Sequence, residues 1–503
     1  MSTGFVSLVG AGPGDPGLLT LRGRRALERA DVVLYDYLAS AALLESIQVP
    51  GQERIHVGKS VGTKCTSQED INCLIVQRAL LGQRVVRLKG GDPFIFGRGS
   101  EEALACVEAE VPFEIIPGVS SIYAVPAYAG IPLTDRELAS GFTVLTGHER
   151  WSSDQKRIDW ARVAGSGGTL VVLMGVHQIE RWTSGLLEGG LAGETPVALV
   201  RWGTTARQEL LTATLETITE EVANQNFRPP AVAVVGRTVE RHASLAWLQN
   251  RPLGKMVIGL TRAKPPVPGT FEPLEDLGAS LFHIPMTHQV DIPSLGTDIA
   301  VMDPANSELV FTSANGVRFF KRALDRAGLD SRVLADKRVW VVGPATAKAC
   351  YRHLGIRPDH MPSTASADGL LELAQEIGVD GLGFVFPSAK AARSTLENGL
   401  KALGATVQRV NLYRTQPKEN AATRLQDALD VGLNLVVIAS PSAVDALCVA
   451  MNEASVPLAS LPVAAIGPTT AAHAQKVGLS VVCIPQEHTM DGLVSALAQK
   501  VTE

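Results

Sequence analysis

The sequence predicts an α/β protein of about three domains, in which strands alternate with helices. Short apolar runs recur along the 503 residues, and many of them break into glycine and proline before a helical segment begins. Hydrophobic residues make up 46% of the chain and charged residues only 19%, as in packed α/β layers and unlike disordered chains. The C-terminal half also repeats its own motifs. Several buried cores are therefore expected.

The charge balance and the cysteines limit the partners and the chemistry. The formal net charge is −5, which argues against a nucleic-acid partner, and an anionic substrate would need local basic clusters. The six cysteines form no CxxC pair, and none of the ten histidines lies in an HExxH arrangement. We therefore expect reduced thiols and no metal.

The N-terminal segment bears on localisation. It contains no basic stretch ahead of an apolar one, since the first basic residue is Arg22, and no apolar run in the chain approaches the length of a membrane span. We expect a cytoplasmic protein without a membrane partner.

Two strand-to-loop segments carry the strongest signal in the N-terminal half. They are Val6–Thr20 (VSLVGAGPGDPGLLT) and Val85–Gly99 (VVRLKGGDPFIFGRG). Paired glycines let backbone amides and carbonyls approach a ligand closely, because no Cβ stands in the way. For either segment alone, an ordinary strand-to-helix connection is the alternative.

Two nucleotide-binding patterns are incomplete. A dinucleotide fingerprint that begins at Gly10 and Gly12 would need glycine at position 15, where Asp15 stands. Residues 58–60 match the end of a phosphate loop, but its leading glycine would occupy the position of Glu53. We reject a nucleoside triphosphatase, and the pattern gives only weak support for nicotinamide binding.

Taken together, the two segments resemble those of uroporphyrinogen-III C-methyltransferase. The resemblance extends over about residues 1–245. The resemblance implies S-adenosylmethionine as methyl donor, small-molecule tetrapyrrole substrates, and a homodimer formed through this half. It also implies a two-lobed tetrapyrrole methyltransferase fold, with lobes at about residues 1–116 and 117–245. Apolar runs at residues 142–148, 169–175, 195–200 and 231–236 are expected as core strands of the second lobe.

Asp36 follows an apolar strand, at the position where α/β enzymes keep catalytic groups. From local sequence alone, a helix N-cap ahead of Leu38 is favoured. Methyl transfer to carbon needs a base for the released proton, and the resemblance assigns this role to Asp36 and proton donation to Lys59. A surface lysine in a loop is the alternative for Lys59. Tyr37 replaces the arginine usual in the family, a departure that bears on one contact to a substrate carboxylate.

The resemblance also implies binding residues. Substrate contacts fall on Arg22 and Arg98. Contacts to the methyl donor fall on Pro13, Gly90, Gly91, Asp92, Ile95, Ser120, Ser121, Met174 and Gly203. Helix capping by the serines, core packing of the methionine and a turn at the last glycine are the alternatives.

The pattern resets near residues 250–254, so we place a linker at 246–254 and a second domain at 255–503. Within it, residues 309–317 resemble 435–444, and residues 342–347 resemble 466–471. This repeat predicts two similar α/β lobes. Each copy places small polar residues at a strand end ahead of a helix, where amide donors could bind anions, and simple capping is the alternative.

These motifs resemble uroporphyrinogen-III synthase, which closes linear hydroxymethylbilane. The resemblance implies a bilobed α/β synthase, with one lobe at about 255–285 plus 414–503 and the other at about 286–413. Tyr413 would be catalytic, with a buried, capped tyrosine as the alternative. The implied substrate contacts are Ser313, Ser440, Ser442, Thr469 and Thr470.

The two resemblances fit one pathway, because the product of the C-terminal half is the substrate of the N-terminal half. We predict a bifunctional tetrapyrrole enzyme that makes uroporphyrinogen III and methylates it twice to precorrin-2, on the route to sirohaem or cobalamin. One alternative is a methyltransferase for a later precorrin. The other is a C-terminal half that only binds tetrapyrroles.

Overall fold

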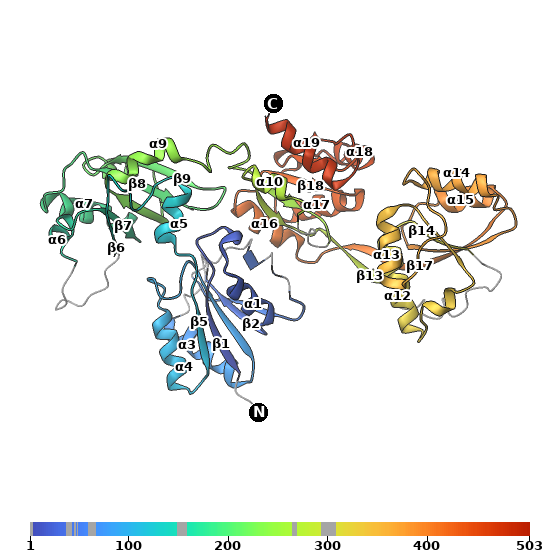
Figure 1. The fold of residues 1–503 in the computed structure, drawn as a ribbon, viewed down its shortest axis with the longest axis horizontal. Helices are drawn as coiled ribbons and strands as arrows, with labels where there is room; N and C mark the ends of the chain where they lie inside the picture. Colours follow the sequence, from blue (N-terminus) through green and yellow to red (C-terminus); the bar gives the residue numbers. More distant parts are fainter. Residues whose placement is uncertain are drawn as a thin grey trace. The chain divides into compact units, whose positions relative to one another are not determined.

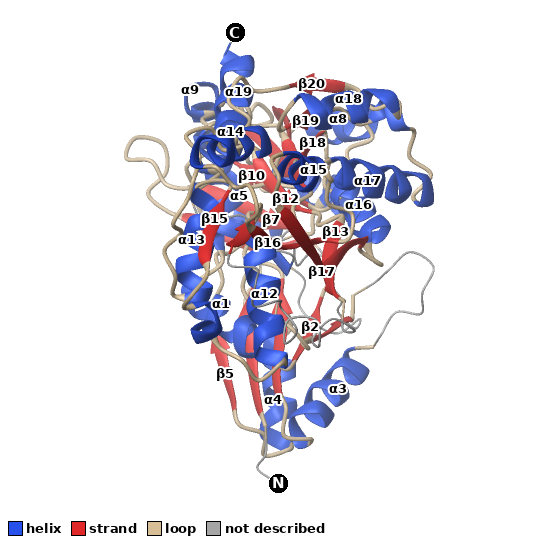
Figure 2. Cartoon of the chain, turned by 90° about the vertical axis from the view of Figure 1, so that its right-hand side faces the viewer, coloured by secondary structure: helices blue, strands red, loops and turns tan. Residues whose placement is uncertain are grey.

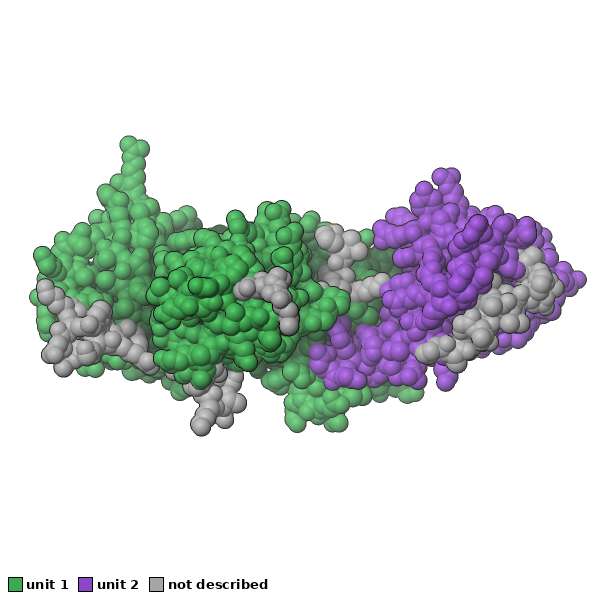
Figure 3. Space-filling model, turned by 90° about the horizontal axis from the view of Figure 1, so that it is seen from below, with its two compact units in different colours: residues 1–284, 422–503 green, residues 285–421 purple. Residues whose placement is uncertain are grey.

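The computed structural model describes residues 4–36, 43–44, 47, 49–58, 67–147, 158–263, 269–292 and 308–502 (Figure 1). Within these residues, the strands form four five-stranded sheets, and helices separate most of the strands along the chain. Figure 2 shows the helices in blue and the strands in red. The α/β prediction is confirmed. The chain divides into two compact units, residues 1–284 with 422–503 and residues 285–421 (Figure 3).

The first sheet is wholly parallel, with strand order β3-β2-β4-β1-β5. Its strands are β1 (Phe5–Gly10), β2 (Val32–Tyr35), β3 (Glu53–His56), β4 (Arg84–Lys89) and β5 (Phe113–Ile116). Its helices are α1 (Leu21–Arg29), α3 (Gln68–Leu80) and α4 (Gly99–Glu108). Alternate strand residues pack on α1 and on the α3–α4 pair, so both faces are buried, as is usual for parallel sheets.

The second sheet has the order β6-β7-β10-β8-β9 and is mostly antiparallel. Its strands are β6 (Phe142–Thr146), β7 (Thr169–Leu173), β8 (Pro196–Arg201), β9 (Glu209–Thr214) and β10 (Ala231–Val235). Its helices are α5 (Ser121–Tyr128), α6 (Trp160–Ala164), α7 (Ile179–Glu188), α8 (Ile218–Asn224) and α9 (His242–Leu245). The four expected core strands are confirmed. The edge strand β9 was not predicted, because only part of its side chains face the core.

The third sheet is parallel, with the order β12-β11-β18-β19-β20. Its strands are β11 (Val257–Leu260), β12 (Ser280–His283), β18 (Leu435–Ile438), β19 (Val463–Ala465) and β20 (Val481–Cys483). Its helices are α10 (Glu272–Asp276), α16 (Ala421–Asp430), α17 (Pro441–Glu453), α18 (Pro468–Lys476) and α19 (Met490–Thr502). The sheet therefore joins strands that lie before and after the 285–421 unit in the sequence.

The 285–421 unit contains the fourth sheet, with the order β13-β17-β16-β14-β15, in which only β13 is antiparallel to its neighbour. Its strands are β13 (Thr287–Asp291), β14 (Glu308–Phe311), β15 (Arg338–Val341), β16 (Gly383–Ala389) and β17 (Thr406–Pro417). Its helices are α12 (Ala314–Arg326), α13 (Pro344–Leu354), α14 (Ala367–Ile377) and α15 (Thr395–Ala402).

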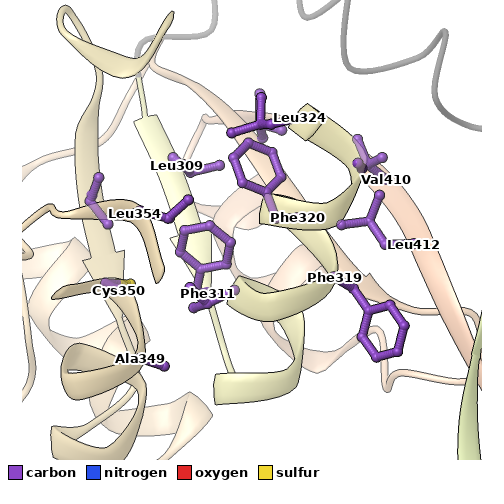
Figure 4. Packing of buried hydrophobic residues seen from close by; sticks show 14 of the residues in the cluster. Leu309, Phe311, Phe319, Phe320, Leu324, Ala349, Cys350, Leu354, Val410 and Leu412 are labelled. Carbon is purple, nitrogen blue, oxygen red and sulfur yellow. The ribbon is translucent and has the colours of Figure 1, made fainter. Parts of the chain in front are cut away.

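Aromatic side chains form the centre of this unit. Phe311 of β14 and Phe320 of α12 meet edge to face with ring centroids 5.4 Å apart, and both are fully buried (Figure 4). Such aromatic pairs stabilise a core beyond the area that they bury. This packing fixes α12 on the sheet beside Leu412 of β17, the neighbour of Tyr413.

The thiols give a first testable prediction. Among the described residues the cysteines are free, with Cys73 exposed, whereas burial raises the pKa of the Cys106 thiol to about 11 and that of Cys350 to about 12. Because the thiolate is the reactive form, iodoacetamide at about pH 8 should alkylate Cys73 and spare the other two until the protein unfolds. Peptide mass spectrometry with and without denaturant measures this. Equal labelling of Cys73 and Cys350 in the native protein would contradict the packing.

Two kinds of feature are absent from the described residues. They contain no cluster of three histidine, cysteine, aspartate or glutamate side chains that could hold a metal ion. In the same part of the chain, no helix is both long and apolar enough to cross a membrane.

Candidate active sites

The loops that follow β1, β4 and β5 meet at the carboxyl edge of the first sheet. Ala11 N donates to Lys89 O at 2.7 Å. Gly12 and Gly91 exchange two backbone hydrogen bonds, of 2.7 and 3.2 Å. In parallel α/β sheets this edge is where ligands bind.

Three glycines bring these loops into direct backbone contact. A Cβ on Gly118 would lie 2.1 Å from Gly91 O, and a Cβ on Gly10 would lie 2.4 Å from the Gly118 Cα. Gly91 also has a φ of +65°, which other residues rarely adopt. No side chain fits at Gly10 or Gly118, so backbone groups form this part of the site.

Asp92 connects two of these loops. Its Oδ2 accepts a hydrogen bond from Gly118 N at 3.0 Å, and its Oδ1 accepts one from Phe94 N at 2.8 Å. Next to it, Ser120 is buried and accepts a hydrogen bond from Ile122 N at the start of α5. The capping alternative for Ser120 is therefore confirmed, while Ser121 is the first residue of the helix.

Several residues with a positive φ lie in the loop after β4 and at the ends of strands of the second sheet. Phe96, Arg98, Met174, Trp202 and Thr204 are non-glycine residues with φ between 48° and 68°. Such conformations cost free energy and cluster at functional sites. They follow β4, β7 and β8, so both lobes contribute to the pattern.

Hydrogen bonds join the two lobes of the N-terminal half at the loop that follows β1. Asp15 N donates to Thr204 Oγ1 at 3.1 Å, and Tyr128 OH donates to Asp15 Oδ2 at 2.8 Å. Burial and the bond to Asp15 raise the pKa of Tyr128. The glycine-proline loop after β1 is thus held against the loop after β8.

Asp36 lies at the end of β2 in a buried ionic network. Arg87 Nη2 donates to Asp36 Oδ1 at 2.6 Å, and Arg87 Nε donates to Glu102 Oε1 at 2.9 Å. Lys89 Nζ donates to the same glutamate oxygen at 2.8 Å. Arg87, Lys89 and Glu102 are almost fully buried, whereas 29% of the Asp36 side chain is exposed. Burial and the nearby Arg87 lower the pKa of Lys89.

In the 285–421 unit, Ser313 and Tyr413 come together from opposite ends of the unit's sequence. Their hydroxyl oxygens are 3.4 Å apart, and Ser313 Oγ also accepts a hydrogen bond from Gly316 N in the first turn of α12. The Tyr413 ring is buried and stacks on Phe319, with ring centroids 4.5 Å apart. β17 continues past Tyr413 to Pro417.

The matching repeat in the other unit has the same local structure. Ser440 ends the loop after β18 and accepts a hydrogen bond from Ala443 N at 3.3 Å, as Ser313 does from Gly316 N. Ser440 and Ser442 hydroxyls lie 3.1 Å apart. The predicted structural repeat of strand, serine and helix is therefore present, with each serine acting as a helix cap.

Comparison with known proteins connects these two sets of residues to families. The profile of tetrapyrrole (corrin/porphyrin) methylases matches residues 6–219, and that of uroporphyrinogen-III synthase HemD matches residues 270–495. The porphyrin biosynthesis protein HemD of Ruminiclostridium josui is 34% identical over an alignment of 503 positions, which covers 99% of this chain and 98% of that protein. The chain belongs to this fused methylase–synthase family.

Other relatives match the methyltransferase half. An S-adenosyl-L-methionine-dependent uroporphyrinogen III methyltransferase of Methanosarcina barkeri is 46% identical over 48% of this chain and 93% of the relative. A crystal structure of uroporphyrin-III C-methyltransferase from Thermus thermophilus, complexed with S-adenosylhomocysteine, is 40% identical over 47% of this chain and 99% of that chain, with a TM-score of 0.41. The protein is a tetrapyrrole biosynthesis enzyme that combines uroporphyrinogen-III C-methyltransferase and uroporphyrinogen-III synthase domains.

The remaining candidates of the methyltransferase half lie in different surroundings. Pro13, Gly90 and Ile95 lie in the converging loops, and Met174 is 48% exposed at the end of β7. A Cβ on Gly203 would lie 2.4 Å from a Val125 methyl carbon, so close packing requires glycine there.

The remaining candidates of this half either form ion pairs with a neighbouring carboxylate or lie outside the described residues. Arg22 pairs with Glu114 at 2.6 Å, and Arg98 pairs with Glu101 at 2.6 Å, both at the surface. Their substrate contacts stay predictions. Lys59 and Tyr37 lie outside the described residues.

The remaining synthase candidates lie at the start of α18. Thr469 is exposed and Thr470 is buried. One turn on, His473 Nε2 lies 2.6 Å from Asp445 Oδ1 of α17, which joins the two helices that begin at the candidate residues. The roles of Thr469 and Thr470 stay predictions.

Sequence reasoning missed Arg87, Lys89 and Glu102. A signal was present, because Arg87 and Lys89 alternate with apolar residues in a buried strand and must therefore share one face. Two buried cations on one face require buried counter-charges. That the counter-charge is Glu102 could not be read from the sequence.

A substitution tests whether the network holds Asp36. In Arg87→Lys the charge remains, but a lysine cannot donate to Asp36 and Glu102 in the fixed geometry of a guanidinium. We expect kcat for methyl transfer to fall by about 10- to 100-fold through displacement of Asp36, with KM for the methyl donor unchanged. The matched control is Arg84→Lys, on the exposed start of the same strand. An unchanged kcat in Arg87→Lys would show that Asp36 needs no such support.

Proposed function

We propose that this enzyme converts hydroxymethylbilane into uroporphyrinogen III and then methylates that product twice to give precorrin-2. The observation that carries the methyltransferase step is the backbone cradle of Gly10, Gly91 and Gly118 at the sheet edge where Asp36 is held by Arg87. We further propose the division into residues 1–245, a linker at 246–254 and residues 255–503, and a homodimer through the first of these.

The cradle suits S-adenosylmethionine. A side chain at Gly10 or Gly118 would fill the space between the loops, so the site offers amides and carbonyls. The exposed Ile95 and Met174 add apolar surface from each lobe, and such walls with a few convergent polar groups are typical of cofactor sites. When bound, the cofactor supplies the methyl group.

The protein's own residues position the reactants and take up the proton. The converging loops and Met174 would hold the donor, so that the substrate carbon approaches it in line. Asp36, with its partly exposed carboxylate fixed by the Arg87 guanidinium, would accept the proton that the tetrapyrrole releases from another atom once the new carbon–carbon bond has formed. The catalytic carboxylate thus needs no contact with the donor.

For the synthase step, we propose that the Tyr413 hydroxyl, next to that of Ser313, acts as a mild acid. The buried Tyr413 hydroxyl can donate a hydrogen bond or a proton to the hydroxyl group that leaves hydroxymethylbilane. Ser440, Ser442, Thr469 and Thr470 would supply further donors for substrate carboxylates. Charge-assisted hydrogen bonds of this kind each contribute about 1.5–3 kcal/mol.

Anaerobic incubation of the purified full chain tests both steps. One sample receives hydroxymethylbilane alone, a second also receives S-adenosylmethionine, and a third receives uroporphyrinogen III with S-adenosylmethionine. We expect the type III isomer in the first sample and dimethylated product, identified by mass and absorbance, in the other two. Only the type I isomer in the first sample would leave the C-terminal half as a tetrapyrrole-binding module, and absence of methylation in the third would refute the methyltransferase assignment.

A further inference from the structure

One face of α12 carries three arginines, and ion pairs among the described residues involve only two of them. Arg318, Arg322 and Arg326 are spaced four residues apart and so share a face. Asp291 of β13 lies 3.2 Å from an Arg322 nitrogen and 2.9 Å from an Arg326 nitrogen. One carboxylate therefore serves two of the three arginines, and Arg318 makes no ion pair with any residue in the described part of the chain.

Arg318 is also partly removed from water. Its Nε is buried and has no acceptor among the described residues, and its Nη2 reaches Gln289 Oε1 only at 3.4 Å. Burial and the neighbouring Arg322 lower the pKa of Arg318. A half-buried cation without a counter-ion costs free energy, so its presence indicates a use other than stability.

The position of Arg318 connects it to the proposed synthase residues. Its guanidinium carbon lies 5.0 Å from the centre of the Phe319 ring, on which the Tyr413 ring stacks. The same helix begins at Ser313, whose hydroxyl lies 3.4 Å from that of Tyr413. A cation with no ion pair among the described residues thus lies beside two hydroxyl groups in one small region of this unit.

We propose that Arg318 binds a side-chain carboxylate of the linear tetrapyrrole substrate. A carboxylate would accept hydrogen bonds from the terminal amines of the Arg318 guanidinium and would supply a negative charge beside it. The Tyr413 and Ser313 hydroxyls would then face the part of the substrate next to that carboxylate. This inference rests on the proposed synthase function.

The test compares Arg318→Met with Arg326→Met in the full chain. Arg326 lies on the same face but is already paired with Asp291. We expect KM for hydroxymethylbilane to rise by about 10- to 100-fold in Arg318→Met with kcat largely kept, and to change little in Arg326→Met. Arg318→Lys should recover part of the loss. Methylation of supplied uroporphyrinogen III by the same samples should be unchanged, which controls for folding.

Thermal unfolding separates a binding role from a structural one. Removing an unpaired, half-buried cation should leave the melting temperature of Arg318→Met unchanged or higher. An unchanged KM would overturn the proposal. A lower melting temperature, together with a lower kcat and a higher KM, would mean that Arg318 has a structural role. That result would also overturn the proposal.

Failure of the proposed synthase function has a different signature, because the wild type itself would then make no uroporphyrinogen III. In that case calorimetric titration with uroporphyrin III decides. A larger dissociation constant for Arg318→Met than for the wild type would support the carboxylate contact in a binding module. Equal binding by both proteins would overturn it.

Discussion

Asp36→Asn is expected to lose methyl transfer while synthase activity persists. Asparagine has the shape of aspartate and keeps an oxygen that can accept the Arg87 hydrogen bond, but it cannot take up a proton. Loss of a general base lowers rates by about 10²- to 10⁴-fold, and we expect kcat for methylation of supplied uroporphyrinogen III to fall by that factor. Conversion of hydroxymethylbilane by the same sample measures the other activity.

Asp31→Asn is the matched control for this variant. Asp31 precedes β2, the strand that Asp36 follows, and its side chain is exposed. It accepts a hydrogen bond from Arg84 N at 2.8 Å and takes no part in the ionic network of Arg87. Methylation by Asp31→Asn should equal that of the wild type. If Asp36→Asn also methylates at the wild-type rate, the base lies elsewhere in the site.

Gly118→Ala is expected to destroy binding of the methyl donor. Its Cβ would lie 2.1 Å from Gly91 O, far inside contact distance, and the obstacle is backbone, which cannot rotate away. The loops after β4 and β5 must therefore separate, and the cradle that they form is lost. We expect the dissociation constant for S-adenosylhomocysteine, measured by calorimetry, to rise by roughly 100-fold or more.

Gly141→Ala controls for the general effect of adding a methyl group. Gly141 belongs to the same half of the chain, and its new Cβ would have nothing within 4 Å. Its affinity should match that of the wild type. A Gly118→Ala variant that binds with wild-type affinity would show that the donor does not depend on the contact between these loops.

Much of the methyltransferase site could be predicted from the sequence, because its residues lie in short segments directly after strands. Once β1, β2, β4 and β5 are parallel neighbours, the loops that contain Gly10, Asp36, Gly91 and Gly118 must meet at one edge. The period of two in a strand and the glycine-rich breaks are local properties. They can be read without knowing the partners of each strand.

The contacts that depend on tertiary packing could not be predicted. Arg87 meets both Asp36 and Glu102 only because β2 and α4 pack beside β4, and the sequence contains other carboxylates that would serve equally well. Likewise, Ser313 and Tyr413 are brought together by the position of β17 in the sheet. The roles of Lys59, Arg22 and Thr469 depend on the substrate and stay predictions.

The order of strands in the third sheet has a consequence for synthesis on the ribosome. β11 pairs with β12 on one side and with β18 on the other, where Gly259 lies opposite Val436. Until residues beyond 435 emerge, β11 and β12 form only a two-stranded sheet, which is marginally stable at best. The 285–421 unit, whose strands all lie within its own sequence, is complete earlier. The nascent chain therefore finishes its inserted unit before the sheet that flanks it in sequence, and that late long-range pairing is the step most open to misfolding.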